Sequence, residues 1–273
     1  EKEEPGGGGG IHICGRAHTN AEGGKGSSEI GGAVYGGNDD ADNSGTLQYI
    51  RLEYTGFAFD EEHEANGISF YGVGNGTIVD HCQAYKGSDD GFEFFGGSVN
   101  VSNLVAVSCS DDSFDWTEGW NGKGTNLVAY QEAESTLGYD CDCLMECDNN
   151  GSNNAATPVA HPVLKNLILV GNGGSKQGIR LRAGTEVEID NAKVCGKGQP
   201  LTVETALTEN ALKNGTSKLT NITLTSELSS KEGIYTHADF IAVTSNKVDA
   251  NLSYSSFEDI RKECSWMNGS WVK

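Results

Sequence analysis

Short apolar segments recur along the chain, and turn-forming Gly, Asn, Asp or Ser residues separate each segment from the next. The clearest internal match is between Ser88–Phe94 and Ser110–Trp116, which lie 22 residues apart. The tetrapeptide Asn-Leu-Val-Ala follows each copy, at Asn103–Ala106 and Asn126–Ala129. A period of this length with strand-like composition is typical of stacked coils in a solenoid.

An asparagine precedes each of five short strands in one register. Each strand is apolar at its first and third positions and variable at its second, as expected of a strand with one buried face. Stacked side-chain amides can bond to the coil above and below, so we predict a buried asparagine column. The column is Asn103, Asn126, Asn166, Asn191 and Asn221, and Tyr49–Leu52 and His81–Ala84 share its register with other residues at the turn.

A second set of strands follows acidic turns. Its apolar triplets align as Ile68–Phe70, Phe92–Phe94, Phe114–Trp116, Met145–Cys147 and Ile179–Leu181. Because successive strand residues face opposite sides, the middle residue of each triplet is expected to point outward. The predicted outward column is Ser69, Glu93, Asp115, Glu146 and Arg180, and Asp89, Asp90, Asp111 and Asp112 lie at the adjoining turns.

These columns predict an all-β, single-stranded, right-handed parallel β-helix of about seven coils. We expect the coils to occupy residues 1–228, with an insertion at about 133–161. A C-terminal segment, 229–273, leaves the coil register and contains a helix-like stretch near Ser256–Arg261. We expect this segment to cap the open end of the same domain, because a solenoid must cover its last coil.

Several motifs resemble those of a known family and together span nearly the whole chain. They are similar to the secreted, often lipid-anchored, right-handed parallel β-helix proteins common in Bacteroidetes. The resemblance implies the fold and an exported location, but no catalytic residues, since that family has no settled activity. The motifs are Asn43–Glu53, Asn66–Gly67, Gly72–Thr77, Asp89–Gly97, Asp111–Asp115 and Trp266–Trp271.

The charge balance excludes several partners. The chain has 19 Lys and Arg against 39 Asp and Glu, a net charge of −20. Nucleic acids and anionic lipids both require a basic face, so neither is expected as a partner. No apolar run reaches the roughly 18 residues of a membrane helix, so no transmembrane segment is expected. Eight cysteines with abundant Gly, Asn, Ser and Thr favour a secreted or cell-surface protein with disulfides.

The outward acidic column is the strongest chemical feature. Carboxylates on adjacent coils would lie about 4.8 Å apart, close enough to raise one another's pKa or to recruit a cation. Ca²⁺ takes six to eight oxygen ligands, which makes Glu93, Asp115 and Glu146 candidate calcium ligands. No other cofactor is expected.

Two further interpretations of the acidic column stay open. Paired carboxylates can act as general acid and base on a glycosidic bond, which makes Glu93, Asp115 and Glu146 candidate catalytic groups. A cation-assisted lyase would add Arg180 or Arg182 as the base. Against catalysis, none of the six histidines is assigned to this column, and the Gly-His-Gly element of polygalacturonases is missing. Alternatively, the acids are structural, because Asp often bonds its own backbone at turns.

Two other features are weaker signals. Trp120 follows Glu118-Gly119 in a predicted loop and is a candidate platform for a sugar ring, whereas Trp116 is expected to face the core. The spacing of Cys141, Cys143 and Cys147 is the one metal-like pattern, but no second cysteine pair lies nearby. Disulfides are preferred there over buried thiols or zinc.

The favoured function is an exported, non-catalytic surface protein that presents its acidic face to glycans or Ca²⁺. One alternative is a carbohydrate-active enzyme, either a polysaccharide lyase or a glycoside hydrolase. Another is a structural protein that attaches to the cell surface or self-associates through the ends of its β-helix. The candidate ligand-binding residues are Asp89, Asp90, Asp111, Asp112, Trp120 and Arg182.

Overall fold

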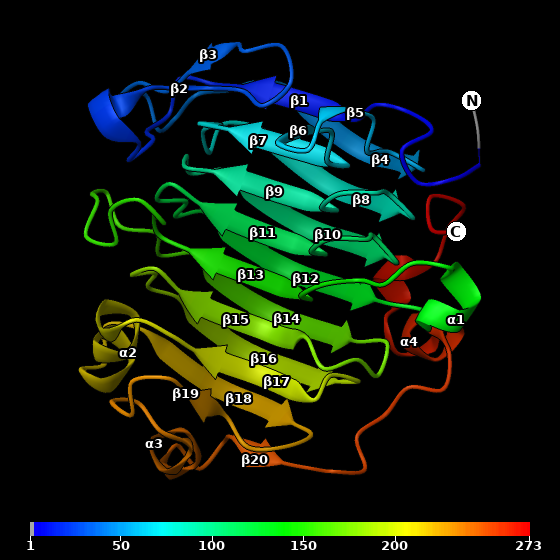
Figure 1. The fold of residues 1–273 in the computed structure, drawn as a ribbon, viewed down its shortest axis with the longest axis vertical. Helices are drawn as coiled ribbons and strands as arrows, with labels where there is room; N and C mark the ends of the chain where they lie inside the picture. The colour runs from blue at the N-terminus through cyan, green and yellow to red at the C-terminus, as the bar shows by residue number, and fades with distance from the viewer. Residues whose placement is uncertain (1–2) are drawn as a thin grey trace.

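Two parallel sheets run the length of the molecule in the computed structural model, which describes residues 3–273 (Figure 1). Each sheet has eight strands, and the chain alternates between the sheets, so each pair of strands forms one coil. The predicted parallel β-helix is confirmed, with eight coils rather than about seven. The additional coil is the last one, whose strands have only two residues each.

The strands follow one another in space as they do along the chain. The first sheet contains β1 (Ile11–Cys14), β7 (Ile68–Tyr71), β9 (Phe92–Phe95), β11 (Phe114–Thr117), β13 (Met145–Asp148), β15 (Gln177–Arg182), β17 (Gln199–Val203) and β19 (Ser229–Ser230). The second contains β4 (Thr46–Glu53), β8 (Ile78–Tyr85), β10 (Asn100–Val107), β12 (Lys123–Tyr130), β14 (Val163–Val170), β16 (Glu188–Cys195), β18 (Lys218–Leu224) and β20 (Lys247–Val248).

The remaining elements lie in the loops between these strands, except for the last α-helix and the last 3₁₀ turn, which follow β20. Two short antiparallel hairpins are β2 (Gly26–Ser27) with β3 (Val34–Tyr35), and β5 (Ala58–Asp60) with β6 (His63–Glu64). The helices are α1 (Glu134–Leu137), α2 (Ala206–Lys213), α3 (His237–Ala242) and α4 (Phe257–Glu263), with 3₁₀ turns at Glu22–Gly24 and Ser265–Met267. Within residues 3–273, no helix is long and apolar enough to cross a membrane.

The register predicted for the first sheet is confirmed. The five apolar triplets from Ile68–Phe70 to Ile179–Leu181 are direct partners on successive strands. Their flanking residues face the core, where Phe70 stacks on Phe94 at 4.9 Å between ring centroids. Inward stacking of this kind fixes the outward column, because every second side chain must then point away from the core.

The predicted asparagine column is present, but its side chains are half-exposed or exposed rather than buried. Each eight-residue strand bends at this position, where φ lies between 58° and 64° for Asn103, Asn126, Asn166 and Asn191. The amide of Asn126 donates to Oδ1 of Asn103 at 2.9 Å, and Asn166 and Asn191 continue the ladder at 3.1 and 2.9 Å. Asn221 leaves the ladder and donates instead to Asp190 at 2.7 Å. Asparagine suits the bend because it tolerates the left-handed conformation.

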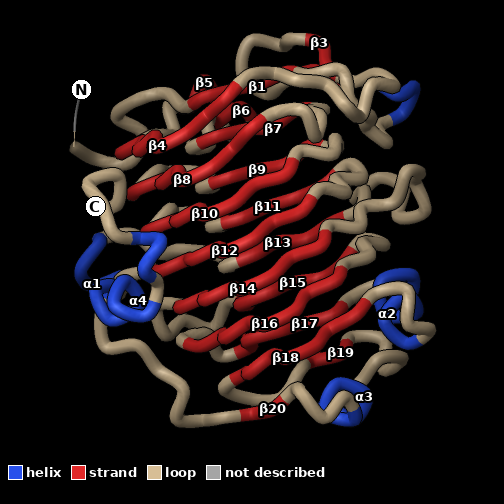
Figure 2. Tube along the Cα trace, turned by 180° about the vertical axis from the view of Figure 1, so that it is seen from behind, coloured by secondary structure: helices blue, strands red, loops and turns tan. Residues whose placement is uncertain are grey.

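The C-terminal segment does two different things. Residues 229–248 complete the last coil, and Phe240 of α3 is fully buried there. Residues 249–273, which we call the strap, turn back and run along the outside of the second sheet as far as the early coils (Figure 2). The strap buries outward-facing side chains of that sheet, among them Val105, Val128 and Cys195. Its helix α4 begins where predicted, after Ser256, whose hydroxyl accepts a hydrogen bond from the Asp259 amide.

All eight cysteines are free thiols, so the predicted disulfide in the 141–147 cluster is wrong. Cys147 occupies an inward-facing position of β13 and is buried among core side chains. Cys143 lies in the preceding turn, where its thiol donates toward Asp142 at 3.6 Å and Gln177 at 3.7 Å. The seven buried cysteines therefore serve as small apolar or weakly polar groups, whereas Cys14 is exposed.

Candidate functional site

A pocket of about 250 Å³ lies over the first sheet and is lined entirely by acidic side chains. Three structural units converge on it: strands β9 and β11 with their preceding turns, the β5–β6 hairpin, and the loop that contains Glu29. The lining residues, which we call the acidic pocket, are Glu29, Glu61, Glu62, Glu64, Asp89, Asp90, Glu93, Asp111 and Asp115. No Lys, Arg or His belongs to this lining.

The outward column supplies the floor of the pocket. Glu93, Asp115, Glu146 and Arg180 are consecutive register partners, as the sequence predicted. Three sets of carboxylates each bring ligand atoms within 4.8 Å of one another, and shared members link the sets into one chain. The sets are Asp89 with Asp90 and Asp111, Asp90 with Glu93 and Asp115, and Asp112 with Asp115 and Glu146.

Some of these acids also hold the turns of the coils. Oδ1 of Asp90 accepts a hydrogen bond from the Asp112 amide at 2.9 Å, and Oδ1 of Asp112 accepts one from the Cys143 amide at 2.8 Å. Asp90 and Asp112 therefore have the structural role at turns that was one of the interpretations of these acids. It does not account for Glu93, which is outward on β9 and accepts from the Asn66 side chain at 2.6 Å.

Burial and mutual repulsion raise the pKa values of the pocket carboxyls. Burial raises the pKa of Asp89 to about 6, and burial with repulsion from Asp89 raises the pKa values of Glu29 and Asp111 to about 7. Burial, followed by nearby carboxylates, also raises the pKa values of Asp90 and Asp115 well above the usual range. The pocket thus binds either protons or an external cation at neutral pH.

The other end of the column carries its own cations. Nε of Arg182 donates to Asp148 at 2.8 Å, its Nη2 donates to Glu146, and Nε of Arg180 donates to Glu204 at 3.1 Å. Burial alone would raise the pKa of Glu146, but a hydrogen bond from Asp112 and the two arginines lower it. Charge is therefore balanced within the protein at Glu146 and is left unbalanced at the acidic pocket.

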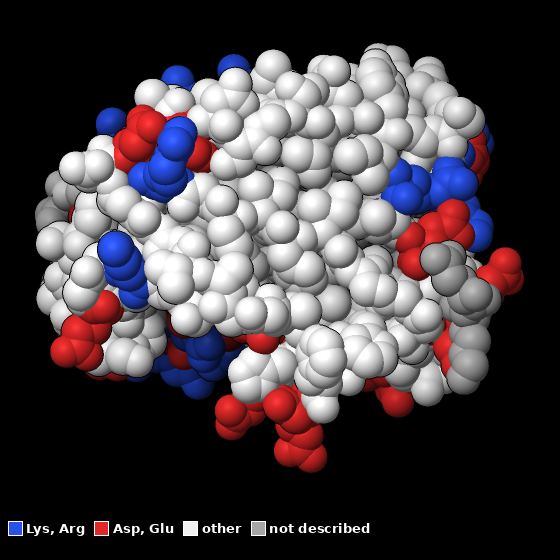
Figure 3. Space-filling view, turned by 90° about the horizontal axis from the view of Figure 1, so that it is seen from above, with Lys and Arg blue, Asp and Glu red and all other residues white. Residues whose placement is uncertain are grey.

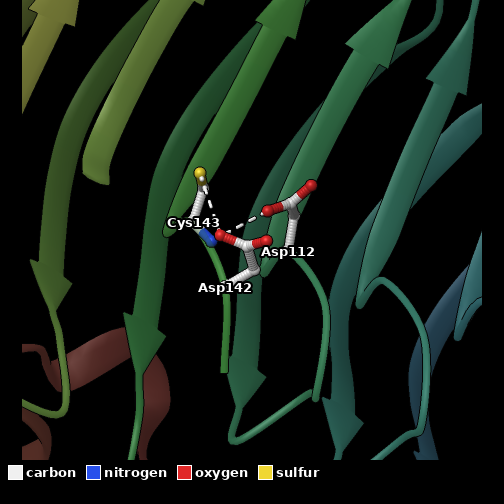
Figure 4. Close-up of side chains that lie close together, drawn as sticks. All are labelled: Asp112, Asp142 and Cys143. Carbon is white, nitrogen blue, oxygen red and sulfur yellow. Dashed lines mark hydrogen bonds between the residues drawn. The ribbon is translucent and has the colours of Figure 1, made fainter. Parts of the chain in front are cut away.

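A mixed group of Asp112, Asp142 and Cys143 also brings potential metal ligands together (Figure 4). Burial raises the pKa of the Cys143 thiol to about 12, so the sulfur stays protonated and donates toward Asp142. A metal binds the thiolate form of cysteine, so this group favours a structural hydrogen-bond network over a zinc centre.

Trp120 is not a ligand platform. It is 1% exposed, its ring stacks on Phe94 at 4.0 Å between centroids, and its indole N–H donates to the Val99 carbonyl at 3.1 Å. Its predicted loop folds inward because the ring fills the space beside Trp116 and Phe94 in the core. Both faces of the ring are therefore unavailable to a sugar.

The sequence analysis missed residues at both sides of the acidic column. His12 of β1 is the register partner of Ser69, so one histidine does lie in the outward column. Glu29, Glu61, Glu62 and Glu64 were missed because the loop and hairpin lie outside the repeat. The run of acidic residues at Glu61, Glu62 and Glu64 was the one signal in the sequence that could have indicated their role. The insertion at 133–161 contributes no residue to the acidic pocket.

The donor set indicates the class of cation. All nine lining side chains offer carboxylate oxygens, the ligands of hard cations such as Ca²⁺ and Mg²⁺, whereas zinc prefers nitrogen and sulfur. Pockets that enclose organic ligands usually measure roughly 300–1,000 Å³, so this one suits hydrated ions better than a buried sugar. Seen from above, acidic side chains project from the edge of the molecule around an uncharged centre (Figure 3).

Comparison with known proteins agrees with the architecture. Residues 1–272 match the family described as a pectate-lyase-like β-helix domain. No curated protein and no solved structure shows a significant match to the chain. Since the match extends over almost the whole sequence, the chain belongs to the pectate-lyase-like β-helix family.

Proposed function

We propose that this protein is a non-catalytic Ca²⁺-binding β-helix protein that presents its bound ions to glycans. The observation that supports the proposal is the imbalance at the acidic pocket, where nine carboxyl side chains converge without a basic residue in the lining. Two of the three linked carboxylate sets lie within this pocket, so it has ligands for more than one ion. Bound cations would replace the protons that the raised pKa values otherwise retain.

Calcium fits better than magnesium. Ca²⁺ accepts six to eight oxygen ligands in flexible geometry, whereas Mg²⁺ requires a near-ideal octahedron and keeps several waters. The ligands here come from two coils, a hairpin and a distant loop, so their arrangement is irregular. Such a set suits the more tolerant cation.

A glycan would complete the coordination at the mouth of the pocket. The cavity of about 250 Å³ is too small to enclose an oligosaccharide, but sugar hydroxyl or carboxylate oxygens can replace water on a partly hydrated Ca²⁺. Weak calcium sites are typical of extracellular modules, where the ion is abundant. This chemistry, together with the composition, supports an exported or cell-surface location as part of the proposal.

A polysaccharide lyase is the second candidate. A cation-assisted lyase would need a base, and Arg180 and Arg182 project from the face that carries the acidic column. However, Arg180 is paired with Glu204, and Arg182 is paired with Asp148 and Glu146. These carboxylates hold both guanidinium groups in the charged form, which is why binding without catalysis is preferred.

Calorimetric titration of the chelator-treated protein tests the proposal. We expect Ca²⁺ to bind more tightly than Mg²⁺ and to raise the melting temperature, because a ligand of the folded state stabilises it by mass action. Asp115→Asn should abolish most of the calcium response and leave the fold intact. Asp249→Asn is the matched control, because that side chain lies outside the acidic pocket and caps the Asn251 amide.

Two results would overturn the proposal. If Ca²⁺ neither binds nor changes the melting temperature, the acids are structural. If an acidic polysaccharide gains unsaturated ends in the presence of Ca²⁺ and loses this reaction in Arg180→Gln, the protein is a lyase.

A further inference from the structure

A second pocket, of about 540 Å³, lies on the other sheet between β4 and the strap. Its lining residues, which we call the strap pocket, are Tyr49, Arg51, Asn268, Gly269, Ser270 and Trp271. The volume falls within the range of roughly 300–1,000 Å³ found for organic ligands. None of its lining residues belongs to the acidic pocket, so the two sites are separate.

Tyr49 occupies an unfavourable position for its residue type. It stands in the asparagine column at φ 54°, in the left-handed region that bulky residues rarely adopt. Its ring lies over His81 at 4.7 Å between centroids and 18° between planes, and the side chain is 63% exposed. Strain held at an exposed aromatic residue points to a functional role, because asparagine would satisfy the fold at this bend.

The walls of the strap pocket present hydrogen-bond donors. Arg51 donates from Nε to Glu53 at 2.7 Å and from Nη1 to the Ser270 carbonyl at 2.6 Å, which directs the guanidinium beside Tyr49. The indole N–H of Trp271 is buried without a hydrogen-bond partner. It lies beneath Gly269, where an ideal Cβ would come within 3.4 Å of it.

The lining of the strap pocket is less acidic than the rest of the molecule. Its lining contains one arginine and no Asp or Glu, although the whole chain carries a net charge of −20. Glu53, next to this lining, accepts from Nε of Arg51 and also pairs with Lys273, so two cations share that carboxylate. A ligand with an anionic group can approach Nη2 of Arg51, which takes no part in the bonds to Glu53 and Ser270. Arginine recognises carboxylate and sulfate oxygens through directed N–H donors.

We propose that the strap pocket binds an anionic saccharide. The sugar ring stacks on the exposed face of Tyr49 and continues the stack that His81 begins. The carboxylate or sulfate group binds Arg51, and ring hydroxyls bind the exposed amide of Asn268. The site requires no calcium and is independent of the function proposed for the acidic pocket.

Calorimetry in the presence of EDTA tests the strap pocket without the cation site. The probes are a uronic acid trisaccharide, a sulfated trisaccharide and a neutral glucose trisaccharide. We expect at least one of the two anionic probes to bind. Comparing the uronic acid probe with the sulfated probe shows whether the site recognises a carboxylate or a sulfate. Tyr49→Asn should weaken this binding roughly tenfold, as expected for loss of an aromatic stacking contact. Its melting temperature should not fall, since asparagine tolerates the bend.

Two further variants complete the experiment. Arg51→Gln should remove the preference for the anionic over the neutral probe. Phe59→Asn removes an aromatic side chain that is 69% exposed outside the strap pocket, and should leave binding unchanged. Absence of binding for all three probes at millimolar concentration, or equal binding by wild type and Tyr49→Asn, would overturn the proposal.

Discussion

Glu93 of β9 and Asp115 of β11 are register partners on adjacent coils, and their carboxylate oxygens lie with one from Asp90 within 4.8 Å of one another. Repulsion in such a group is relieved by a proton or by a cation. The free energy of unfolding should therefore fall as the pH rises and increase when Ca²⁺ binds.

Without cations, the acidic pocket should lose stability as the pH rises. Asp89, Glu29 and Asp111 have folded-state pKa values of about 6 to 7, whereas carboxyls in an unfolded chain have pKa values of about 4. Their raised pKa values stabilise the fold fully below about pH 4, and this contribution is lost between about pH 4 and pH 7. Urea unfolding in EDTA across this range measures the effect.

Asp111→Asn isolates that contribution from the other titrating groups. Between pH 4 and pH 7, the free energy of unfolding should fall less in this variant than in wild type. Saturating Ca²⁺ should make the fall in wild type smaller as well. Ca²⁺ binding should also release protons near neutral pH, which shows as a buffer-dependent binding enthalpy. If the free energy of unfolding fell equally with pH in wild type and in Asp111→Asn, Asp111 would not be one of the groups that cause the fall.

Removing an internal cation should destabilise the far end of the column. Arg182→Gln leaves Asp148 without its ion-pair partner and leaves Glu146 only its longer contact with Arg180 at 3.9 Å, and both carboxylates are mostly buried. We expect the free energy of unfolding to fall by about 1–3 kcal/mol. This is less than the cost of breaking a fully buried ion pair, because the Arg182 side chain is partly exposed. Lys176→Gln is the control, since its exposed pair with Asp142 should contribute less than about 0.5 kcal/mol. Similar losses in both variants would show that Arg182 is not specially required.

The asparagine ladder should contribute measurably to stability. Asn126→Ala removes the amide bonds to Asn103 and from Asn166 and places a β-carbon at φ 60°. We expect a loss of about 1–3 kcal/mol in urea unfolding. Asn126→Gly keeps the backbone conformation accessible and loses only the hydrogen bonds, so it should be less harmful than Asn126→Ala. The reverse order would show that the bend does not favour residues that tolerate the left-handed region.

The eight thiols should differ in reactivity in one simple way. Cys14 is exposed, and the other seven cysteines are buried, where burial raises the pKa of thiols such as Cys82 to about 11. A thiol reagent should modify Cys14 in the native protein and all eight cysteines after unfolding without reductant. Fewer than eight reactive thiols in the unfolded protein would reveal a disulfide that the structure lacks.

The coil register could be predicted from the sequence because every coil must bury the same alternate positions of its strands. Apolar residues at alternate positions of Phe92–Phe94 and Phe114–Trp116 must face one core, so Glu93 and Asp115 had to point outward in adjacent coils. Asn103 and Asn126 marked the bend because few other residues tolerate a positive φ.

Only the tertiary structure decided what lies over those coils. The hairpin that brings Glu62 and Glu64 to the pocket, the inward turn of Trp120 and the return of the strap to Trp271 all depend on non-repeating segments. Such segments carry no periodic signal, because their positions are set by side-chain packing against surfaces that exist only once the coils have stacked. The sequence by itself therefore determined the columns and the direction of their side chains. Folding decided which carboxylates remain without a basic partner.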